Sequence, residues 1–102
     1  MSQVTTHVLD TARGRPAAGI PVRLLHGDDV VALAATNADG RVPGLGPEQL
    51  QAGTYRLEFD VAAYAADAFF PQVVVTFVVA DASHHHVPLL LSPFGYSTYR
   101  GS

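Results

Sequence analysis

The sequence predicts an all-β protein built as a sandwich of two sheets. The dominant hydrophobic period is two, as at residues 55–61, where apolar residues alternate with Arg56, Glu58 and Asp60. Clusters of Gly, Pro, Asn and Asp separate several such runs within 102 residues. Only two short stretches have a helical character. Many short strands with frequent turns in a chain of this length are typical of a two-sheet sandwich.

The expected strands follow one another with short connections. They cover residues 4–9, 22–24, 30–36, 55–61, 72–79, 87–91 and 96–100. A turn at residues 18–21 precedes the second strand, and the turn residues 37–40 end the third. Residues 72–79 are β-branched on both faces, which predicts a central strand.

The two helical candidates are brief. Residues 47–50 form at most one turn. Residues 62–68 are rich in alanine and predict a short helix that stops near Pro71. No internal repeat or linker interrupts the pattern, so residues 1–102 are expected to be a single domain.

The composition is apolar for a small domain. Hydrophobic residues make up 48% of the chain and charged residues only 15%. A domain of this size has little interior in which to bury such residues. We therefore expect other subunits to cover part of the surface.

Several classes of function are disfavoured. A net charge of -3 argues against a nucleic-acid partner. The chain contains no Lys and no Cys, which excludes Schiff-base lysines, thiolate nucleophiles and cysteine metal sites. No run is long enough to span a membrane, and the first residues lack the pattern of a signal peptide. The expected location is cytoplasmic, with no membrane partner.

Histidines are the first candidates for chemistry: His7, His26, His84, His85 and His86. Strand alternation places His86 beside Leu90, on the face opposite the Val and Leu residues of the expected core. A histidine on an outward, partly apolar face fits a site formed where subunits meet. The alternatives are a solvated turn at residues 84–86 or a metal site on His84 and His86. No carboxylate or cysteine at ligand spacing supports the metal site.

Two further side chains have open interpretations. His7 shares a strand face with Thr5 and is either a structural residue or part of a site. Arg41 follows the turn closed by Gly40, so it projects from a loop end, where binding residues concentrate, or simply faces solvent. The strand-forming residues 96–99 predict an ordered tail. These observations alone describe a small, self-associating β domain and do not name a reaction.

Residues 86–102 read His-Val-Pro-Leu-Leu-Leu-Ser-Pro-Phe-Gly-Tyr-Ser-Thr-Tyr-Arg-Gly-Ser. This segment resembles the closing signature of the transthyretin-related hydroxyisourate hydrolases. Three earlier pieces match in order: residues 7–10 with Gly14, Pro16 and Ala17; Thr36 with Asp39, Gly40 and Arg41; and Phe69, Phe70 and Pro71. The resemblance spans nearly the whole chain, and the tail is its most specific part.

The resemblance implies a transthyretin-like (prealbumin) β-sandwich with one short helix. It also implies a homotetramer, a dimer of dimers, with active sites in a channel at the dimer–dimer interface. The implied reaction is hydrolysis of 5-hydroxyisourate to 2-oxo-4-hydroxy-4-carboxy-5-ureidoimidazoline in urate breakdown. Neither a metal nor an organic cofactor is implied.

The family's functional residues carry over onto matching positions. The implied catalytic residues are His7, Arg41 and His86, and the implied substrate-binding residues are Tyr99, Arg100, Gly101 and Ser102. Two imidazoles can activate water, and an arginine can hold the substrate and stabilise an oxyanion. Which histidine acts as the base stays open.

One departure from the family pattern lies just before the tail. The family commonly has His-Tyr-His where this chain has His84, His85 and His86. By alternation His85 faces away from the site, whereas His84 shares the face of His86 and is a possible contributor. Two other functions remain open: a non-catalytic carrier of a small aromatic ligand, and an interaction module without a small-molecule site.

Overall fold

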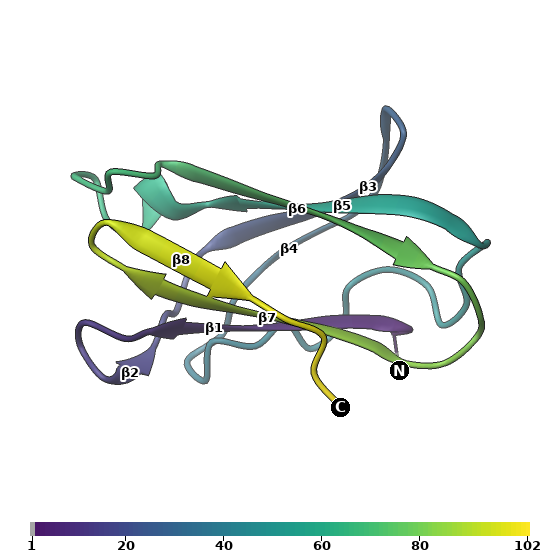
Figure 1. Ribbon diagram of the computed structural model, residues 1–102, viewed down its shortest axis with the longest axis horizontal. Helices are drawn as coiled ribbons and strands as arrows, with labels where there is room; N and C mark the ends of the chain where they lie inside the picture. Colours follow the sequence, from purple (N-terminus) through teal and green to yellow (C-terminus); the bar gives the residue numbers. More distant parts are fainter. Residues whose placement is uncertain (1) are drawn as a thin grey trace.

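The computed structural model describes residues 2–102, so Met1, the first residue of the expected domain, lies outside the described part. These residues form eight β-strands and one turn of 3-10 helix (Figure 1). The elements are β1 (Val4–Asp10), β2 (Arg15–Pro16), β3 (Pro21–His26), β4 (Asp29–Ala35), β5 (Gly53–Asp60), η1 (Val61–Ala63), β6 (Gln72–Val79), β7 (His85–Ser92) and β8 (Gly95–Thr98). Within residues 2–102, no helix has the length and apolar character needed to cross a membrane.

The strands form two four-stranded sheets, with the orders β2-β1-β7-β8 and β4-β3-β5-β6. Figure 1 shows the sheets as two layers, with β8 and β6 next to each other along one side. β1 and β7 run parallel, whereas β7 and β8 are antiparallel. The parallel pair joins the first strand of the chain to the seventh, and this pairing positions the site described below.

The inward faces of both sheets form the core. The alternation expected at residues 55–61 is confirmed, because Tyr55, Leu57 and Phe59 are buried. The three residues of β7 expected to face the core, Val87, Leu89 and Leu91, are buried as well. Each large apolar side chain removed from water stabilises the fold by about 1.5–3 kcal/mol. The Tyr55 hydroxyl donates to the carbonyl of Gln51 at 2.7 Å, so its polar end is satisfied.

The expectation that residues 72–79 form a central strand is wrong. Within the described residues, β6 pairs with β5 alone and lies at the edge of its sheet. Its inward residues Val73 and Val79 are buried, but Val74 and Val78 are 43% and 62% exposed. β-Branched residues on both faces usually mark a strand that is covered on both. In the single chain the outward face and one backbone edge of β6 stay open, which makes them available to another chain.

The expected helix is shorter than predicted. Instead of residues 62–68, the helical turn η1 covers Val61–Ala63, and turns follow it. Short helices are marginal unless tertiary contacts support them. Here Tyr64 leaves the helical turn and its hydroxyl donates to the carboxylate of Asp10 at 2.7 Å. The stretch 47–50 contains no helical turn.

Candidate active site

The parallel pairing of β1 and β7 places two histidines on one outward sheet face. The register sets Thr5 opposite His86 and His7 opposite Pro88. Thr5, His7 and His86 are half-buried, and the residues on either side of each in the chain are buried. His7 and His86 therefore lie on adjacent strands of the same face. The position predicted for His86, on the side opposite the core, is confirmed.

A tight turn brings Arg41 to the same face. The side-chain oxygen of Asn37 accepts from the N–H groups of Asp39 at 2.9 Å and Arg41 at 3.1 Å. Gly40 has a φ of 74°, and its carbonyl accepts from the N–H of Val8 at 2.8 Å. A Cβ at Gly40 would lie 2.3 Å from the Val8 carbonyl oxygen, so only glycine fits there.

The turn also fixes the imidazole of His7. His7 and Arg41 form an isolated antiparallel bridge, and Nε2 of His7 lies 2.8 Å from the carbonyl oxygen of Asp39. A carbonyl oxygen can only accept a hydrogen bond, so Nε2 carries the proton of the neutral ring. Nδ1 of His7 is then the nitrogen with a free lone pair.

His86 occupies a more shielded position. Burial lowers the pKa of His86 below its usual value, and the nearby positive charges of Arg41, His84 and His7 lower it further. A hydrogen bond to the backbone of Thr5 acts in the opposite direction. Because the effects that lower the pKa of His86 outweigh this hydrogen bond, its imidazole is neutral near pH 7 and can accept a proton.

The tail packs directly on His86. The N–H of Gly101 donates to the carbonyl of His86 at 2.8 Å, in the register that β7 and β8 already share. A Cβ at Gly101 would lie 2.5 Å from Cδ2 of His86. Pro88 has no N–H and interrupts the ladder between β8 and this bridge, but its carbonyl accepts from the Thr98 hydroxyl at 2.7 Å.

An open hollow of about 510 Å³ lies where these segments meet. Arg41, His86 and Ser102 line it, together with Thr5, Thr6, Asn37, Val42, Pro43 and His84. His7 is not part of this lining, but its bridge to Arg41 and its electrostatic effect on His86 place it beside these two residues. The structure thus brings together four of the predicted residues, His7, Arg41, His86 and Ser102, with Gly101 packed behind them.

Tyr99 and Arg100 lie elsewhere in the single chain. Both line a separate, more apolar groove between β6 and the tail, which also contains Phe77, Val87 and the buried His85. The Arg100 guanidinium donates to the Ser83 hydroxyl at 3.2 Å. Within one chain these two residues are therefore not part of the hollow around His86, and their binding role stays a prediction.

The remaining histidines occupy different environments. His85 is buried, and its Nδ1 donates to the Ser83 carbonyl at 2.6 Å, so the residue does face away from the site as expected. His26 stacks on Tyr55 with ring centroids 4.4 Å apart, in the other sheet. His84 is exposed and contacts the hydroxyl of Thr5. Among residues 2–102, no group of three or more His, Asp or Glu side chains is placed to hold a metal ion.

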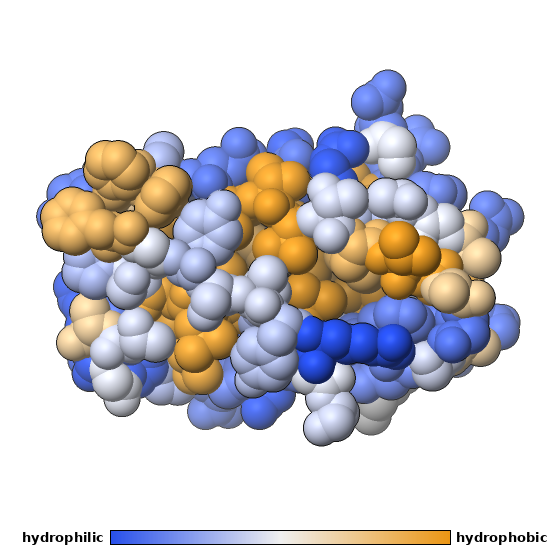
Figure 2. Space-filling model, viewed as in Figure 1, coloured by the Kyte–Doolittle hydropathy of each residue, from blue (hydrophilic) through white to orange (hydrophobic). Residues whose placement is uncertain are grey.

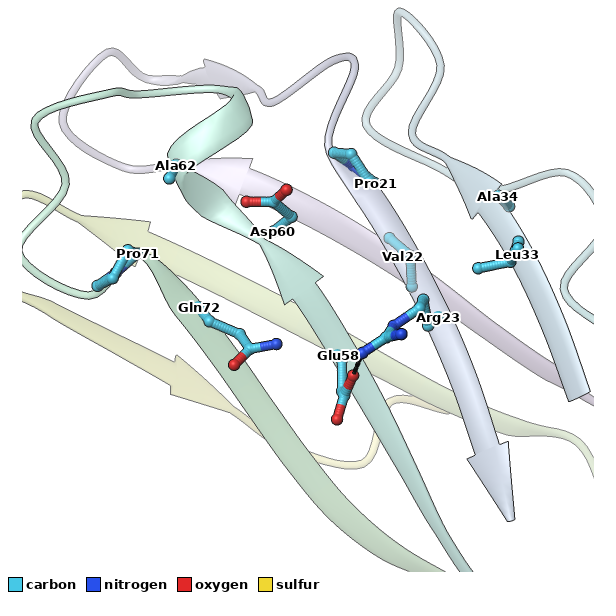
Figure 3. A pocket seen from close by; sticks show the side chains of 10 residues that line it. All are labelled: Pro21, Val22, Arg23, Leu33, Ala34, Glu58, Asp60, Ala62, Pro71 and Gln72. Carbon is cyan, nitrogen blue, oxygen red and sulfur yellow. Dashed lines mark hydrogen bonds and ion pairs between the residues drawn. The ribbon is translucent and has the colours of Figure 1, made fainter. Parts of the chain in front are cut away.

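A second hollow lies on the outward face of the other sheet (Figure 3). Figure 3 shows Arg23 on β3 and Glu58 on β5 pointing toward each other, and the two side chains form an ion pair. Leu33 and Pro71 lie at opposite sides of the hollow. With Arg23 and Glu58 neutralising each other, the remaining charged side chain in the lining is Asp60, and the lining contains no imidazole.

Thr5 and Asn37 were missed as candidate residues. Alternation shows that Thr5 shares a face with His7, but it cannot show that β7 lies alongside. Asn37 could have been recognised from its place at the start of the turn, because Asn side chains commonly bond backbone N–H groups there.

The fold and the site together define a transthyretin-like sandwich with a histidine- and arginine-lined hollow on one outward face. The family model described as HIUase/Transthyretin family matches residues 4–101. The chain therefore belongs to this family, and the resemblance seen in its sequence is confirmed.

Curated relatives match almost all of the chain. It is 51% identical to the 5-hydroxyisourate hydrolase of Deinococcus radiodurans, covering 97% of this chain and 95% of that protein. It is 44% identical to the uric acid degradation bifunctional protein of Arabidopsis thaliana, where the match covers 97% of this chain but only 37% of the larger protein.

Solved structures confirm the expected transthyretin-like fold. The 5-hydroxyisourate hydrolase of Klebsiella pneumoniae superimposes with a TM-score of 0.93 at 38% identity, and each chain is covered completely. Sea bream transthyretin in complex with thyroxine superimposes with a TM-score of 0.88 at 30% identity, covering 97% of this chain and 94% of that one. The same fold thus occurs in a hydrolase and in a protein solved in complex with thyroxine.

Proposed function

We propose that this chain is an enzyme that hydrolyses 5-hydroxyisourate to 2-oxo-4-hydroxy-4-carboxy-5-ureidoimidazoline in urate breakdown. The observation that carries the proposal is that Arg41 and His86 line one hollow, with His7 bridged to Arg41 and acting electrostatically on His86. Relatives that are 51% and 45% identical bear the name 5-hydroxyisourate hydrolase. Family membership and the chemistry of the hollow therefore support the same reaction.

His86 is the general base in this proposal. Hydrolysis needs a water whose oxygen adds to the ring carbonyl carbon while a base takes its proton. The lowered pKa of His86 keeps this ring neutral at physiological pH, where a base must carry a free lone pair. His7, held by the Asp39 carbonyl, presents Nδ1 as a second acceptor that orients the same water.

Arg41 acts on the charge that develops. Negative charge builds on the carbonyl oxygen as water adds, and a fixed guanidinium stabilises it. The Asn37 turn and the bridge to His7 hold the backbone of Arg41 in place, so little ordering is needed during the reaction. Ser102 forms part of the wall of the hollow, and Gly101 packs against His86.

The proposal includes a homotetramer. Figure 2 shows apolar side chains gathered between β6 and β8 and at the end of the sandwich where β8 begins. Four aromatic side chains, Phe69, Phe70, Phe94 and Tyr96, contact one another and are 37–80% exposed. Open strand edges beside an exposed apolar cluster support pairing between copies of the chain. A further contact through the β1–β7 face would complete the site.

The test is a direct assay. Urate oxidase generates 5-hydroxyisourate, and its ultraviolet absorbance is followed with and without the protein. Acceleration over the spontaneous decay is expected. His86→Asn should lower kcat/KM by roughly 10²–10⁴-fold because it removes the base. Arg41→Ala should lower it by about 10²–10³-fold through loss of oxyanion stabilisation. A decay rate equal to the spontaneous one would refute the hydrolase proposal.

The main competing function is that of a carrier. The similarity to transthyretin bound to thyroxine favours it. A carrier would bind a small aromatic ligand without accelerating the decay of 5-hydroxyisourate, and His86→Asn would leave the decay unchanged. The same assay therefore separates the two functions.

A further inference from the structure

The hydroxyl of Thr5 lies between two imidazoles. Its Oγ1 is 2.8 Å from Nδ1 of His86 and 2.8 Å from Nε2 of His84. The two rings are inclined by only 26°, with centroids 6.2 Å apart. A hydroxyl has one proton to donate and lone pairs with which to accept. The hydroxyl can therefore donate to at most one of the two rings, and one hydrogen bond accepted with one donated would make the two contacts a directed chain.

The role of His86 sets the direction of this chain. Nδ1 of His86 faces Thr5, so Nε2 is the nitrogen left to meet a water in the hollow. If Nε2 holds the free lone pair, the proton of the neutral ring is on Nδ1 and is donated to Thr5. The proton of Thr5 then points to Nε2 of His84, whose lone pair accepts it.

The two ends of the chain differ in exposure. His86 is half-buried and is surrounded by Arg41, His7 and His84, all of which carry or can carry positive charge. His84 is exposed, and the Arg100 guanidinium reaches its backbone carbonyl at 3.4 Å. A positive charge is better solvated on the exposed ring than on the half-buried one. Moving a proton outward along the chain is therefore favourable.

We propose, on the basis of the hydrolase function above, that Thr5 and His84 are positioning residues that act through His86 by relaying its proton. As the water oxygen bonds to the carbonyl carbon, Nε2 of His86 takes a water proton. Nδ1 of His86 passes its own proton to Oγ1 of Thr5, and the Thr5 hydroxyl proton passes to Nε2 of His84. The reverse shift returns one proton to the leaving nitrogen when the C–N bond breaks.

Removing the hydroxyl tests the relay. Thr5→Val keeps the shape and β-branching of the side chain but breaks both hydrogen bonds. It should lower kcat by about tenfold, a part of what a positioned base supplies, with KM changed less than twofold. Thr5→Ser restores the hydroxyl and should recover most of the rate. Thr54→Val makes the same chemical change on β5, outside the hollow, and should leave kcat unchanged.

The second end of the chain is tested with His84→Asn. This variant should lower kcat by the same factor, and the double variant Thr5→Val/His84→Asn should be no slower than either single variant, because the residues act as one unit. Losing the charge of His84 should also raise the pKa of His86 and move the acid limb of the rate profile to higher pH. The relay would be overturned if the double variant lost kcat by the product of the two single losses, or if Thr5→Val kept the wild-type kcat.

Nitrogen NMR of the histidine rings supplies a readout that does not depend on turnover. In the wild-type protein, neutral His86 should be protonated on Nδ1, and in Thr5→Val this preference should disappear while the fold, monitored by circular dichroism, is retained. An Nε2-protonated His86 in the wild-type protein would overturn the proposed direction. If the protein does not accelerate hydroxyisourate decay at all, the hydrolase function fails, whereas the NMR result still shows whether the chain of hydrogen bonds exists.

Discussion

At the scale of single residues, Gly101 allows the tail to approach His86 closely. Its missing side chain lets the backbone lie against the imidazole, because a Cβ there would be 2.5 Å from Cδ2 of His86 and 3.4 Å from Cγ of Pro88. Neither neighbour can move freely, since the His86 ring is tied to Thr5 and Pro88 is buried in β7. The glycine is therefore a requirement of the site's geometry rather than of backbone conformation.

Gly101→Ala should displace either the tail or the ring. A misplacement of the base by about 1 Å can cost roughly 10²-fold in rate, so kcat should fall by about that factor. Thermal unfolding should change little, because the substitution lies beyond the last strand. Gly95→Ala is the matched control, since its Cβ would meet only the Ser92 hydroxyl, at 3.4 Å. Full activity in Gly101→Ala would show that contact between the tail and His86 is unimportant.

At the scale of elements, sequence patterns predicted where the strands lie in the chain better than which strands pair with each other. Alternation correctly assigned the inward and outward faces of residues 55–61 and of β7. It could not reveal that β1 lies parallel to β7, because a strand's own pattern says which face is buried and not which strand is adjacent. The contact of Thr5 with both His84 and His86 depends on that register and was missed.

The edge position of β6 was mispredicted for a related reason. Apolar residues on both faces indicate a strand covered on both faces, but one chain's sequence does not say whether its own segments or another copy provide the cover. The expected site residues, in turn, came mainly from the resemblance of the tail. Physical patterns alone left His7 and Arg41 undecided between structural and functional roles.

The tail beyond β8 should be needed for activity more than for folding. In the described residues it is tied to β7 by the hydrogen bond from Gly101 to His86, while Thr98 within β8 keeps its own bond to Pro88. Deleting the tail also removes the exposed bonds of the Arg100 guanidinium to the Ser83 hydroxyl and the His84 carbonyl. Each lost bond costs about 1 kcal/mol or less, and 1 kcal/mol lowers Tm by roughly 4–8 °C in a domain of this size. Deletion of residues 99–102 should therefore abolish turnover while a cooperative unfolding transition remains. An unfolded truncated chain would instead assign the tail a structural role.

At the scale of the whole molecule, the apolar composition and the open edges have a common explanation. The chain is 48% hydrophobic, and Phe94 and Leu33 are 80% and 71% exposed. The two residues lie near different sheet edges. Phe94 is in the turn between β7 and β8, beside the edge strand β8, whereas Leu33 belongs to β4, the edge strand of the other sheet that lies farthest from β6. The proposed assembly uses the side of β6 and β8 and leaves β4 in solvent.

This difference makes the assembly testable with two matched substitutions. Phe94→Asp places a charge in the aromatic cluster of Phe69, Phe70 and Tyr96, where burial against a partner would be costly. Wild-type protein should have about four times the chain mass of 10.8 kDa by light scattering, and Phe94→Asp should have a lower mass and a lower rate of hydroxyisourate hydrolysis. Leu33→Asp introduces the same charge at a similarly exposed residue and should keep both the wild-type mass and the wild-type rate of hydrolysis. A monomeric wild-type protein would exclude a site shared between subunits. An unchanged mass in Phe94→Asp would show that the interface does not include the aromatic cluster beside β8, because the added charge is tolerated only where it stays in solvent.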